Sequence, residues 1–414
     1  MLQKVSLGVK DLGKYRMLVG SEFMDEIDAL GEELNGLRLC HINSTPFGGG
    51  VAELLSSLIP MMRGLGLRAD WQIIRGDQRF FTVTKSLHNA LQGQTYPLIK
   101  MEATQRAYKS NNLANAKELD LDYDVFIVND PQPAALRHFC DISGAKWIWR
   151  CHVDSSEPDP ETWQFLSPFI EEYDAAVFTM QEFAPEGLHV PVVKFIPPAI
   201  DPINTKNMPL PSTLWREMLD NIGIEKSRPL ICQVSRFDPW KDPFGVMQAY
   251  RLAKKQVPGL QLALVTCFAG DDPEAWDIYA AVNEEAEKDP DIHILSNLTG
   301  VGNMEVNAFQ TASAVVIQKS IKEGFGLVVA ESLWKGTAVV AGNTGGIPMQ
   351  MGGALHDYLV NGIEQCAEKL VYLLEHPEVA EELGAEGKEH IRQNFLMPRL
   401  LRDELRLVRE LVHE

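Results

Sequence analysis

Two basic side chains, Arg236 and Lys241, follow an apolar segment, Leu230–Val234, whose composition predicts a buried β-strand. Ligands of open parallel sheets bind beyond the carboxyl ends of the strands, so both cations are expected at a binding edge. Two cations there can neutralise a diphosphate, because a guanidinium contacts two phosphate oxygens at once. By itself the loop is more typical of a solvated segment in which Arg236 pairs with Asp238 or Asp242.

A second segment, Glu323-Gly-Phe-Gly-Leu-Val-Val-Ala-Glu331, joins a predicted strand to a predicted helix and carries two carboxylates. Glu323 lies on the glycine turn at the mouth of the helix, whereas Glu331 lies about two turns further along it. Carboxylates at such different depths can bind two separate sets of hydroxyl groups on one extended ligand. The alternative is that Glu323 is a solvated turn residue and Glu331 a surface charge.

A glycine-rich segment near the amino terminus, Asn43-Ser-Thr-Pro-Phe-Gly48-Gly49-Gly50-Val-Ala-Glu53, leaves a predicted strand and enters a predicted helix. Glycines let backbone N–H groups approach a ligand closely, and the start of a helix favours negative charge. The segment matches neither the dinucleotide-binding nor the Walker pattern. Phosphate contact and a plain tight turn are therefore equally favoured.

His152 follows the predicted strand that ends at Arg150, and Asp154 lies two residues further on. A lone histidine at a strand end is more often a structural residue than a ligand-binding one. Trp147 and Trp149 are spaced by two on the same strand, which predicts core residues rather than platforms for a sugar.

The elements that must position these residues come from alternating patterns. Apolar β-branched runs alternate with helical periodicity, which predicts parallel βαβ units. The expected strands are residues 37–42, 69–74, 125–129, 146–150, 175–179 and 193–196, then 230–234, 260–266, 292–295, 314–318 and 338–341. The clearest expected helices are residues 51–65, 245–256 and 327–335.

Proline-rich residues 197–212 separate two halves of this alternation and predict a domain boundary near residue 205. The expected domains are residues 1–205, which include an extra segment 1–36 of no evident role, and residues 206–390. Residues 391–414 are expected to include a charged amphipathic helix that packs back on the body.

Composition limits the partners. The chain has 414 residues, with 38 basic and 57 acidic side chains and a net charge of −19, so we expect neither nucleic acid nor anionic membrane as a partner.

The six cysteines form no CxxC pair, which predicts buried thiols in a reducing compartment and no structural zinc. No secretory start and no apolar run of membrane length is found, so a cytoplasmic location is expected. Asp120-Leu-Asp122 precedes a predicted strand and is expected to be solvated rather than metal-binding.

Together, the basic loop and the two-glutamate segment about 80 residues later resemble the retaining GT-B glycosyltransferases of the sucrose-synthase-like group, glycosyltransferase family 4. Residues 41–53, 81–93 and 233–243 look most like the trehalose glycosyltransferring synthases within that group. The resemblance implies an α/β fold of the GT-B type, with two Rossmann-like doubly wound domains facing a central cleft.

The resemblance also implies a role for each matching residue. Arg236 and Lys241 would hold the donor diphosphate, Glu323 the transferred glucose, and Glu331 the ribose hydroxyls. Residues 295–301 would touch the base. Gly49 and Gly50 would face the diphosphate, the amides of Phe325, Gly326 and Leu327 would cap it, and His152 would contact the sugar, with Arg150 and Asp154 on the acceptor side.

The implied reaction makes trehalose from UDP-glucose or ADP-glucose and free glucose. No metal or other cofactor is expected to be required, and a homodimer is one expected assembly. The alternatives are a trehalose phosphorylase using glucose-1-phosphate and a non-catalytic protein that binds sugar nucleotides. Three positions depart from the broad pattern: Ser235 and Asp242 replace common glycines, and Lys319 replaces a common proline. These departures leave the ionic groups intact but can change how the leaving group is held.

Overall fold

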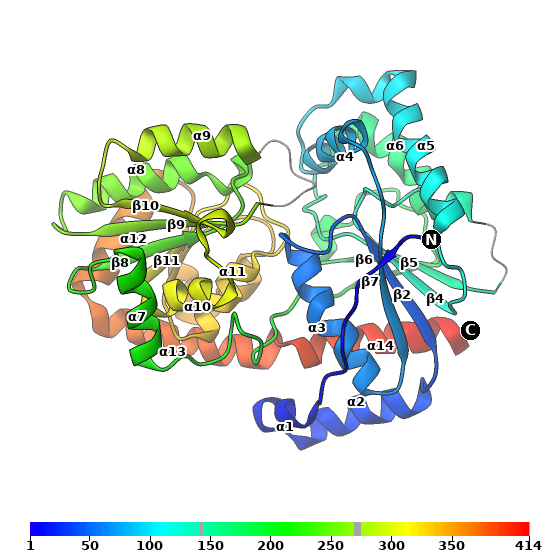
Figure 1. Cartoon of the computed structure of the whole chain (residues 1–414), viewed down its shortest axis with the longest axis horizontal. Coiled ribbons are helices and arrows are strands. Elements are labelled where there is room, and N and C mark those ends of the chain that lie inside the picture. The colour runs from blue at the N-terminus through cyan, green and yellow to red at the C-terminus, as the bar shows by residue number, and fades with distance from the viewer. Residues whose placement is uncertain (141–143, 269–274, 414) are drawn as a thin grey trace. The chain divides into compact units, whose positions relative to one another are not determined.

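The computed structural model describes residues 1–140, 144–268 and 275–413, which divide into two compact units (Figure 1). Unit 1 contains the described residues up to 198 together with residues 397–413, and unit 2 contains the described residues between 199 and 396. The chain changes unit after residue 198, earlier than the predicted position near 205. The reason is that Ile200 already bonds to unit 2, since its N–H donates to the carbonyl of Phe395 at 2.9 Å.

Unit 1 is built on a sheet that has seven strands in the described residues, in the order β1-β3-β2-β4-β5-β6-β7. Neighbouring strands run parallel except β1, which pairs antiparallel with β3. The central strands β4 and β5 are almost wholly buried, which agrees with the apolar runs 125–128 and 147–149 that they contain. The strands are β1 Gln3–Lys4, β2 Arg38–Asn43, β3 Arg68–Ile73, β4 Val125–Asn129, β5 Lys146–Arg150, β6 Ala175–Phe178 and β7 Val192–Phe195.

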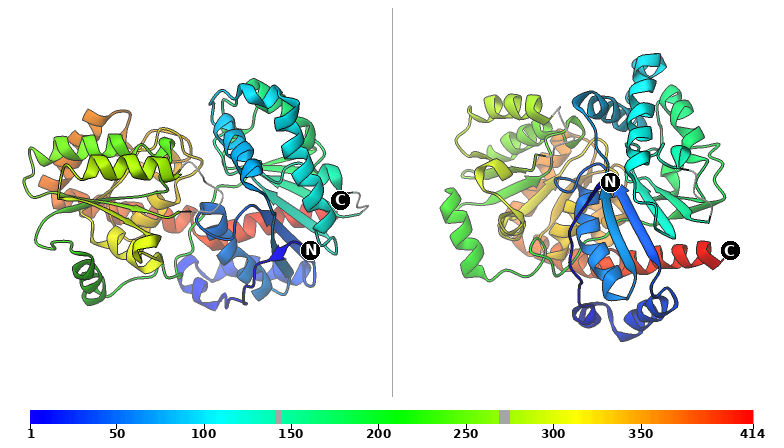
Figure 2. Two further views of the ribbon diagram at one scale, coloured as in Figure 1. Left: turned by 45° about the horizontal axis from the view of Figure 1, so that its top comes forward. Right: turned by 45° about the vertical axis from the view of Figure 1, so that its right-hand side comes forward.

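Helices cover both faces of this sheet, with α4, α5 and α6 on one side and α2, α3 and α14 on the other (Figure 2). Trp147 and Trp149 are fully buried, which confirms that they are core residues. The helices are α1 Gly13–Val19, α2 Ser21–Glu33, α3 Gly50–Gly64, α4 Gln78–Leu91, α5 Glu102–Glu118, α6 Pro160–Ile170 and α14 Met397–His413.

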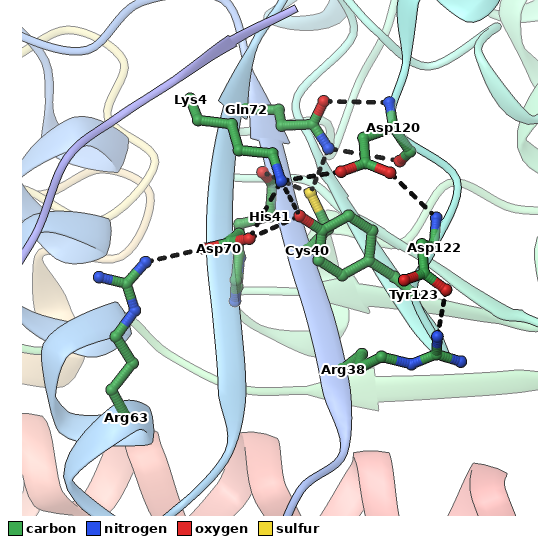
Figure 3. A network of polar contacts seen from close by, with 10 residues as sticks. All are labelled: Lys4, Arg38, Cys40, His41, Arg63, Asp70, Gln72, Asp120, Asp122 and Tyr123. Atoms are coloured by element: carbon green, nitrogen blue, oxygen red, sulfur yellow. Dashed lines mark hydrogen bonds and ion pairs between the residues drawn. The ribbon is translucent and has the colours of Figure 1, made fainter. Parts of the chain in front are cut away.

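The amino-terminal segment, whose role the sequence does not reveal, adds the edge strand β1 and helices α1 and α2 to unit 1. A polar network holds β1 in place (Figure 3). Lys4 Nζ contacts Asp120 and the Tyr123 hydroxyl at 2.8 Å each, and the same hydroxyl donates to Asp70 at 2.6 Å. Burial opposes the charge of Lys4, but these contacts hold its pKa above the ordinary value. The prediction of solvated surface is therefore confirmed for Asp122, which is 80% exposed, but Asp120 is a partly shielded ion-pair partner of Lys4.

Helix α14 closes unit 1 from the opposite end of the chain. Its apolar stripe packs on α2 and α3. Arg399 donates to the carbonyls of Pro197 and Pro198 at 2.7 Å each, so the end of the chain is tied to the segment at which the chain leaves unit 1. The Arg399 side chain is largely shielded from water, and this desolvation lowers the pKa of its guanidinium to about 10 although Asp403 opposes the shift.

Unit 2 is a parallel sheet with six strands in the described residues, in the order β10-β9-β8-β11-β12-β13. The strands are β8 Leu230–Val234, β9 Gln261–Thr266, β10 Ile292–Ser296, β11 Val315–Gln318, β12 Val339–Gly342 and β13 Leu359–Val360. The helices are α7 Ser212–Ile222, α8 Pro243–Lys254, α9 Ala275–Ala286, α10 Asn303–Ala312, α11 Leu327–Trp334, α12 Ile363–Glu375 and α13 Pro377–Asn394.

The predicted strands agree with the observed ones to within about one residue, a normal uncertainty of strand ends. The sequence missed β1 and β13, which have two residues each and leave no periodic signal. One cysteine prediction is also wrong, because Cys267 is exposed while the other five thiols are buried. Within the described ranges, no helix is both long and apolar enough to cross a membrane.

Candidate active site

The basic loop of unit 2 lies between β8 and α8, as the sequence predicts. Asp238 and Asp242 shape it: Asp238 accepts from the N–H of Trp240 at 2.9 Å, and Asp242 caps α8 by accepting from the N–H of Gly245 at 3.0 Å. Asp242 has φ +49°, a left-handed conformation that aspartate tolerates better than most residues. The short turn Pro239–Lys241 then aims Lys241 toward the neighbouring strand β11.

Lys241 meets Glu323 across the two adjacent strands β8 and β11. The Lys241 Nζ and a Glu323 carboxylate oxygen are 2.6 Å apart. The same oxygen accepts from the Ser320 hydroxyl at 3.1 Å and from the Gln318 amide at 3.4 Å. Glu323 is only 8% exposed, so it is not the solvated turn residue of the alternative interpretation. The structure thus brings together two of the predicted site residues, one cation and one carboxylate.

The turn that carries Glu323 needs glycine at defined positions. Gly326 is the N-cap of α11 and has φ +83°, which favours glycine strongly. A Cβ on Gly345 would come within 1.7 Å of the Glu323 carbonyl oxygen, so the 342–346 loop can pack on the turn only without that side chain. Phe325 is buried and Leu327 begins the helix, so their backbone lies at the positive end of the α11 dipole.

Arg236 is half-buried in the same loop. It comes two residues after the end of β8, whereas residues 295–301, the predicted base contact, cover the end of β10 and the turn after it, two strands away in the sheet. Leu298 in that segment is 59% exposed, an apolar side chain open to a planar ligand. The carboxyl edge of the unit 2 sheet therefore carries cations in the middle and an exposed apolar side chain on one side.

Glu331 is fully buried on α11, so the alternative that it is a surface charge is wrong. One of its oxygens pairs with Lys206 Nζ at 2.7 Å, and the other accepts from the Gln310 amide at 2.8 Å. Burial opposes ionisation, but Lys206 and then Lys335 hold the pKa of Glu331 below its ordinary value. Ribose hydroxyls would have to share or replace the contact with Lys206, a residue of the connector between the units.

The glycine-rich segment of unit 1 enters α3, which begins at Gly50 with Gly49 as its N-cap. A Cβ built on Gly49 meets no atom within 4 Å, so packing within the protein does not explain the glycine. Open space beside the first N–H groups of a helix suits the predicted contact with a phosphate.

His152 lies after β5 in unit 1 and is held by Asn129 at the end of β4. The two side chains meet at 2.9 Å between His152 Nε2 and Asn129 Oδ1. The Asn129 amide nitrogen donates to the carbonyl of Ile42 at 3.1 Å, so its oxygen faces the histidine and accepts. The ring therefore carries its proton on Nε2 and offers Nδ1 as an acceptor. Burial, followed by the charges of Arg150 and His41, holds the pKa of His152 well below its usual range and keeps the ring neutral.

Arg150 and Asp154, the predicted acceptor-side residues, are both buried. Arg150 pairs with Glu404 of α14 at 2.6 Å, and the other oxygen of Glu404 lies 3.0 Å from His41 Nε2. Although burial opposes it, His41 and Arg150 hold the pKa of Glu404 below the ordinary value. Asp154 accepts from the Ser156 hydroxyl at 2.6 Å. Arg150 therefore positions the strand end that carries His152 and is engaged by protein groups.

Sequence reasoning missed the partners of the site residues: Lys206, Asn129, Glu404 and the ion pair between Lys319 and Asp242. Glu404 is 254 positions away from Arg150 and gives no local signal. Of these partners, only Lys319 and Asp242 gave a signal in the sequence, because each replaces a residue that is common in the glycosyltransferase group that the chain resembles.

The fold and this edge define the class of protein: two Rossmann-like units, with a cation loop, a carboxylate and a helix N-terminus in unit 2, are those of a GT-B glycosyltransferase. Residues 216–390 match the family of glycosyl transferases group 1, and residues 41–185 match the trehalose synthase N-terminal domain. The chain belongs to the trehalose synthase family.

Two curated relatives and one solved structure illustrate the similarity. The chain is 48% identical to a trehalose synthase of Rubrobacter xylanophilus over 100% of both chains. It is 27% identical to a trehalose phosphorylase of Pleurotus pulmonarius over 85% of this chain and 54% of that protein. The fold matches the crystal structure of an α,α-trehalose 6-phosphate synthase from Burkholderia multivorans, with a TM-score of 0.69, 17% identity and coverage of 91% and 99% of the two chains.

Proposed function

We propose that this protein makes trehalose by transferring glucose from a nucleoside-diphosphate glucose, UDP-glucose or ADP-glucose, to free glucose with retention at the donor carbon. Membership of the trehalose synthase family supports the product. The single observation that carries the donor is the Lys241–Glu323 pair, which sets a cation for a diphosphate beside a carboxylate for sugar hydroxyls.

In this proposal the unit 2 cations stabilise the leaving group. Arg236 and Lys241 balance the negative charge that grows on the diphosphate as its bond to the anomeric carbon breaks. The amino end of α11 adds its dipole at the same edge. These groups act without a metal ion, so we expect added chelator to leave turnover unchanged.

Glu323 accepts hydrogen bonds from the hydroxyls of the transferred glucose. These bonds strengthen as the sugar becomes electron-poor. The bond between the anomeric carbon and the diphosphate oxygen breaks, the bond to the acceptor hydroxyl oxygen forms on the same face, and the acceptor proton passes to the leaving diphosphate. His152, which is neutral and bonded to Asn129 through Nε2, would accept a hydrogen bond from a sugar hydroxyl at Nδ1 and orient it.

The test is to incubate the protein with UDP-glucose or ADP-glucose and free glucose, to measure the nucleotide released, and to identify the disaccharide by NMR. The expected product is the non-reducing α,α-linked disaccharide. A reducing disaccharide, or transfer to glucose-6-phosphate alone, would overturn the proposal.

Two further arms separate the alternatives. Release of phosphate from glucose-1-phosphate and glucose, with no turnover of either nucleotide sugar, would identify a phosphorylase. Binding of UDP without turnover of any donor would identify a non-catalytic protein. The match to the phosphorylase spans only about half of that protein, which favours the synthase.

A further inference from the structure

Two ion pairs of opposite polarity join the basic loop to the turn that carries Glu323. Lys241 of the loop pairs with Glu323 of the turn, and Lys319, just after β11, pairs in the other direction with Asp242 of the loop. A backbone bond lies between them, because the N–H of Ile321 donates to the carbonyl of Trp240 at 2.7 Å. The two segments are therefore fastened to each other at three points.

The Lys319–Asp242 pair is largely shielded from water. The side chains are 10% and 19% exposed. The thiol of Cys366 on α12 interacts electrostatically with both Lys319 and Asp242. Burial raises its pKa to about 12, so the thiol is neutral and compensates neither charge. A charge removed from one side of this pair would leave the other side without compensation in a poorly hydrated place.

The two oxygens of Asp242 have different tasks. One caps α8 through the N–H of Gly245, and the other faces Lys319. The capping task needs an oxygen acceptor in a left-handed conformation, which asparagine supplies equally well. A negative charge is therefore not needed for the cap, and it stands directly beside Lys241, where it would oppose an incoming diphosphate.

We propose that Lys319 is a positioning residue of the donor site: its ammonium neutralises Asp242, so that this carboxylate does not repel the diphosphate that Lys241 binds. The inference rests on the proposed function in that the anion is taken to be a nucleotide-sugar diphosphate. It makes an asymmetric prediction. Loss of Lys319 exposes the Asp242 charge, whereas loss of the Asp242 charge leaves an extra cation.

The test measures binding of UDP and of ADP by calorimetry, the donor KM and kcat, and the unfolding temperature for three variants. Lys319→Met should weaken binding of whichever nucleotide the protein prefers by about tenfold and raise the donor KM similarly, with a smaller effect on kcat. Asp242→Asn should bind at least as tightly as the unmodified protein. The double variant should restore affinity to within about threefold, because no uncompensated charge remains.

A matched control lies at the other end of α8. Lys254 pairs with Asp289 at 2.7 Å, with the two side chains 25% and 15% exposed, so Lys254→Met should lower the unfolding temperature and leave nucleotide affinity unchanged. Equal nucleotide affinity in the Lys319→Met variant and the unmodified protein, or no recovery in the double variant, would overturn the inference. If the unmodified protein binds the nucleotide normally but turns over no donor, the proposed function is overturned. The role of Lys319 is then still tested by the nucleotide affinities of the variants.

Discussion

Replacement of Lys241 by methionine tests the centre of the proposed site. The change keeps most of the side-chain volume and removes the cation that lies 2.6 Å from Glu323. One charged contact to a leaving diphosphate is worth about 2.7 kcal/mol of barrier or more, so kcat should fall about 100-fold. The fold should suffer less. Glu323 keeps its bonds from Ser320 and Gln318, so we expect about 1–3 kcal/mol of lost stability.

The assay is nucleotide release at saturating glucose, well below the unfolding temperature, with urea unfolding on the same samples. Adding Glu323→Gln to Lys241→Met should recover stability, because no buried carboxylate is left without its cation, while turnover stays low. Lys288→Met is the control, since Lys288 forms an exposed ion pair with Glu285. Turnover of the Lys241→Met variant within about threefold of normal would show that the diphosphate assignment of Lys241 is wrong.

Three further outcomes are expected. Glu331→Gln should weaken nucleotide binding about tenfold with little change in kcat, as calorimetry and kinetics can show; a loss confined to kcat would remove it from the ribose site. His152→Ala should lower transfer to glucose about 100-fold while UDP or ADP affinity, measured by calorimetry, stays within about twofold; an equal loss of both would refute its acceptor-side role. Glu404→Gln should lower the free energy of unfolding of unit 1 by about 3–5 kcal/mol, as urea unfolding can show, and this loss should become smaller as the pH falls. The sign follows because the pKa of Glu404 is depressed in the folded protein, so its contribution is present above the unfolded pKa and is lost as the pH falls through the folded one. Glu410→Gln, on the same helix but half-exposed, should cost less than about 1 kcal/mol, and equal effects of the two variants would refute the buried-pair argument.

The sequence by itself determined the chain of βαβ units and the edge at which chemistry can take place. Parallel strands leave a strong signal, because each is buried on both faces and is bounded by a periodic helix. Their carboxyl ends must meet at one edge, so the residues after β8 and β11 were expected at the same edge of the sheet. That β8 and β11 are neighbours, which brings Lys241 to Glu323, was decided by the strand order of the folded sheet.

The partners of these residues were decided only by the tertiary structure. Arg150 is neutralised by Glu404, a residue of the last helix, and Glu331 by Lys206 of the connector. The sequence left Glu331 open between a ligand contact and a surface charge, because helical position alone does not say how much protein covers a residue. Electrostatic pairing acts through space and is strongest where water is excluded, and both conditions depend on how distant segments pack. Which residues could do chemistry was therefore set along the chain, but which charges are free to do it was set by the fold.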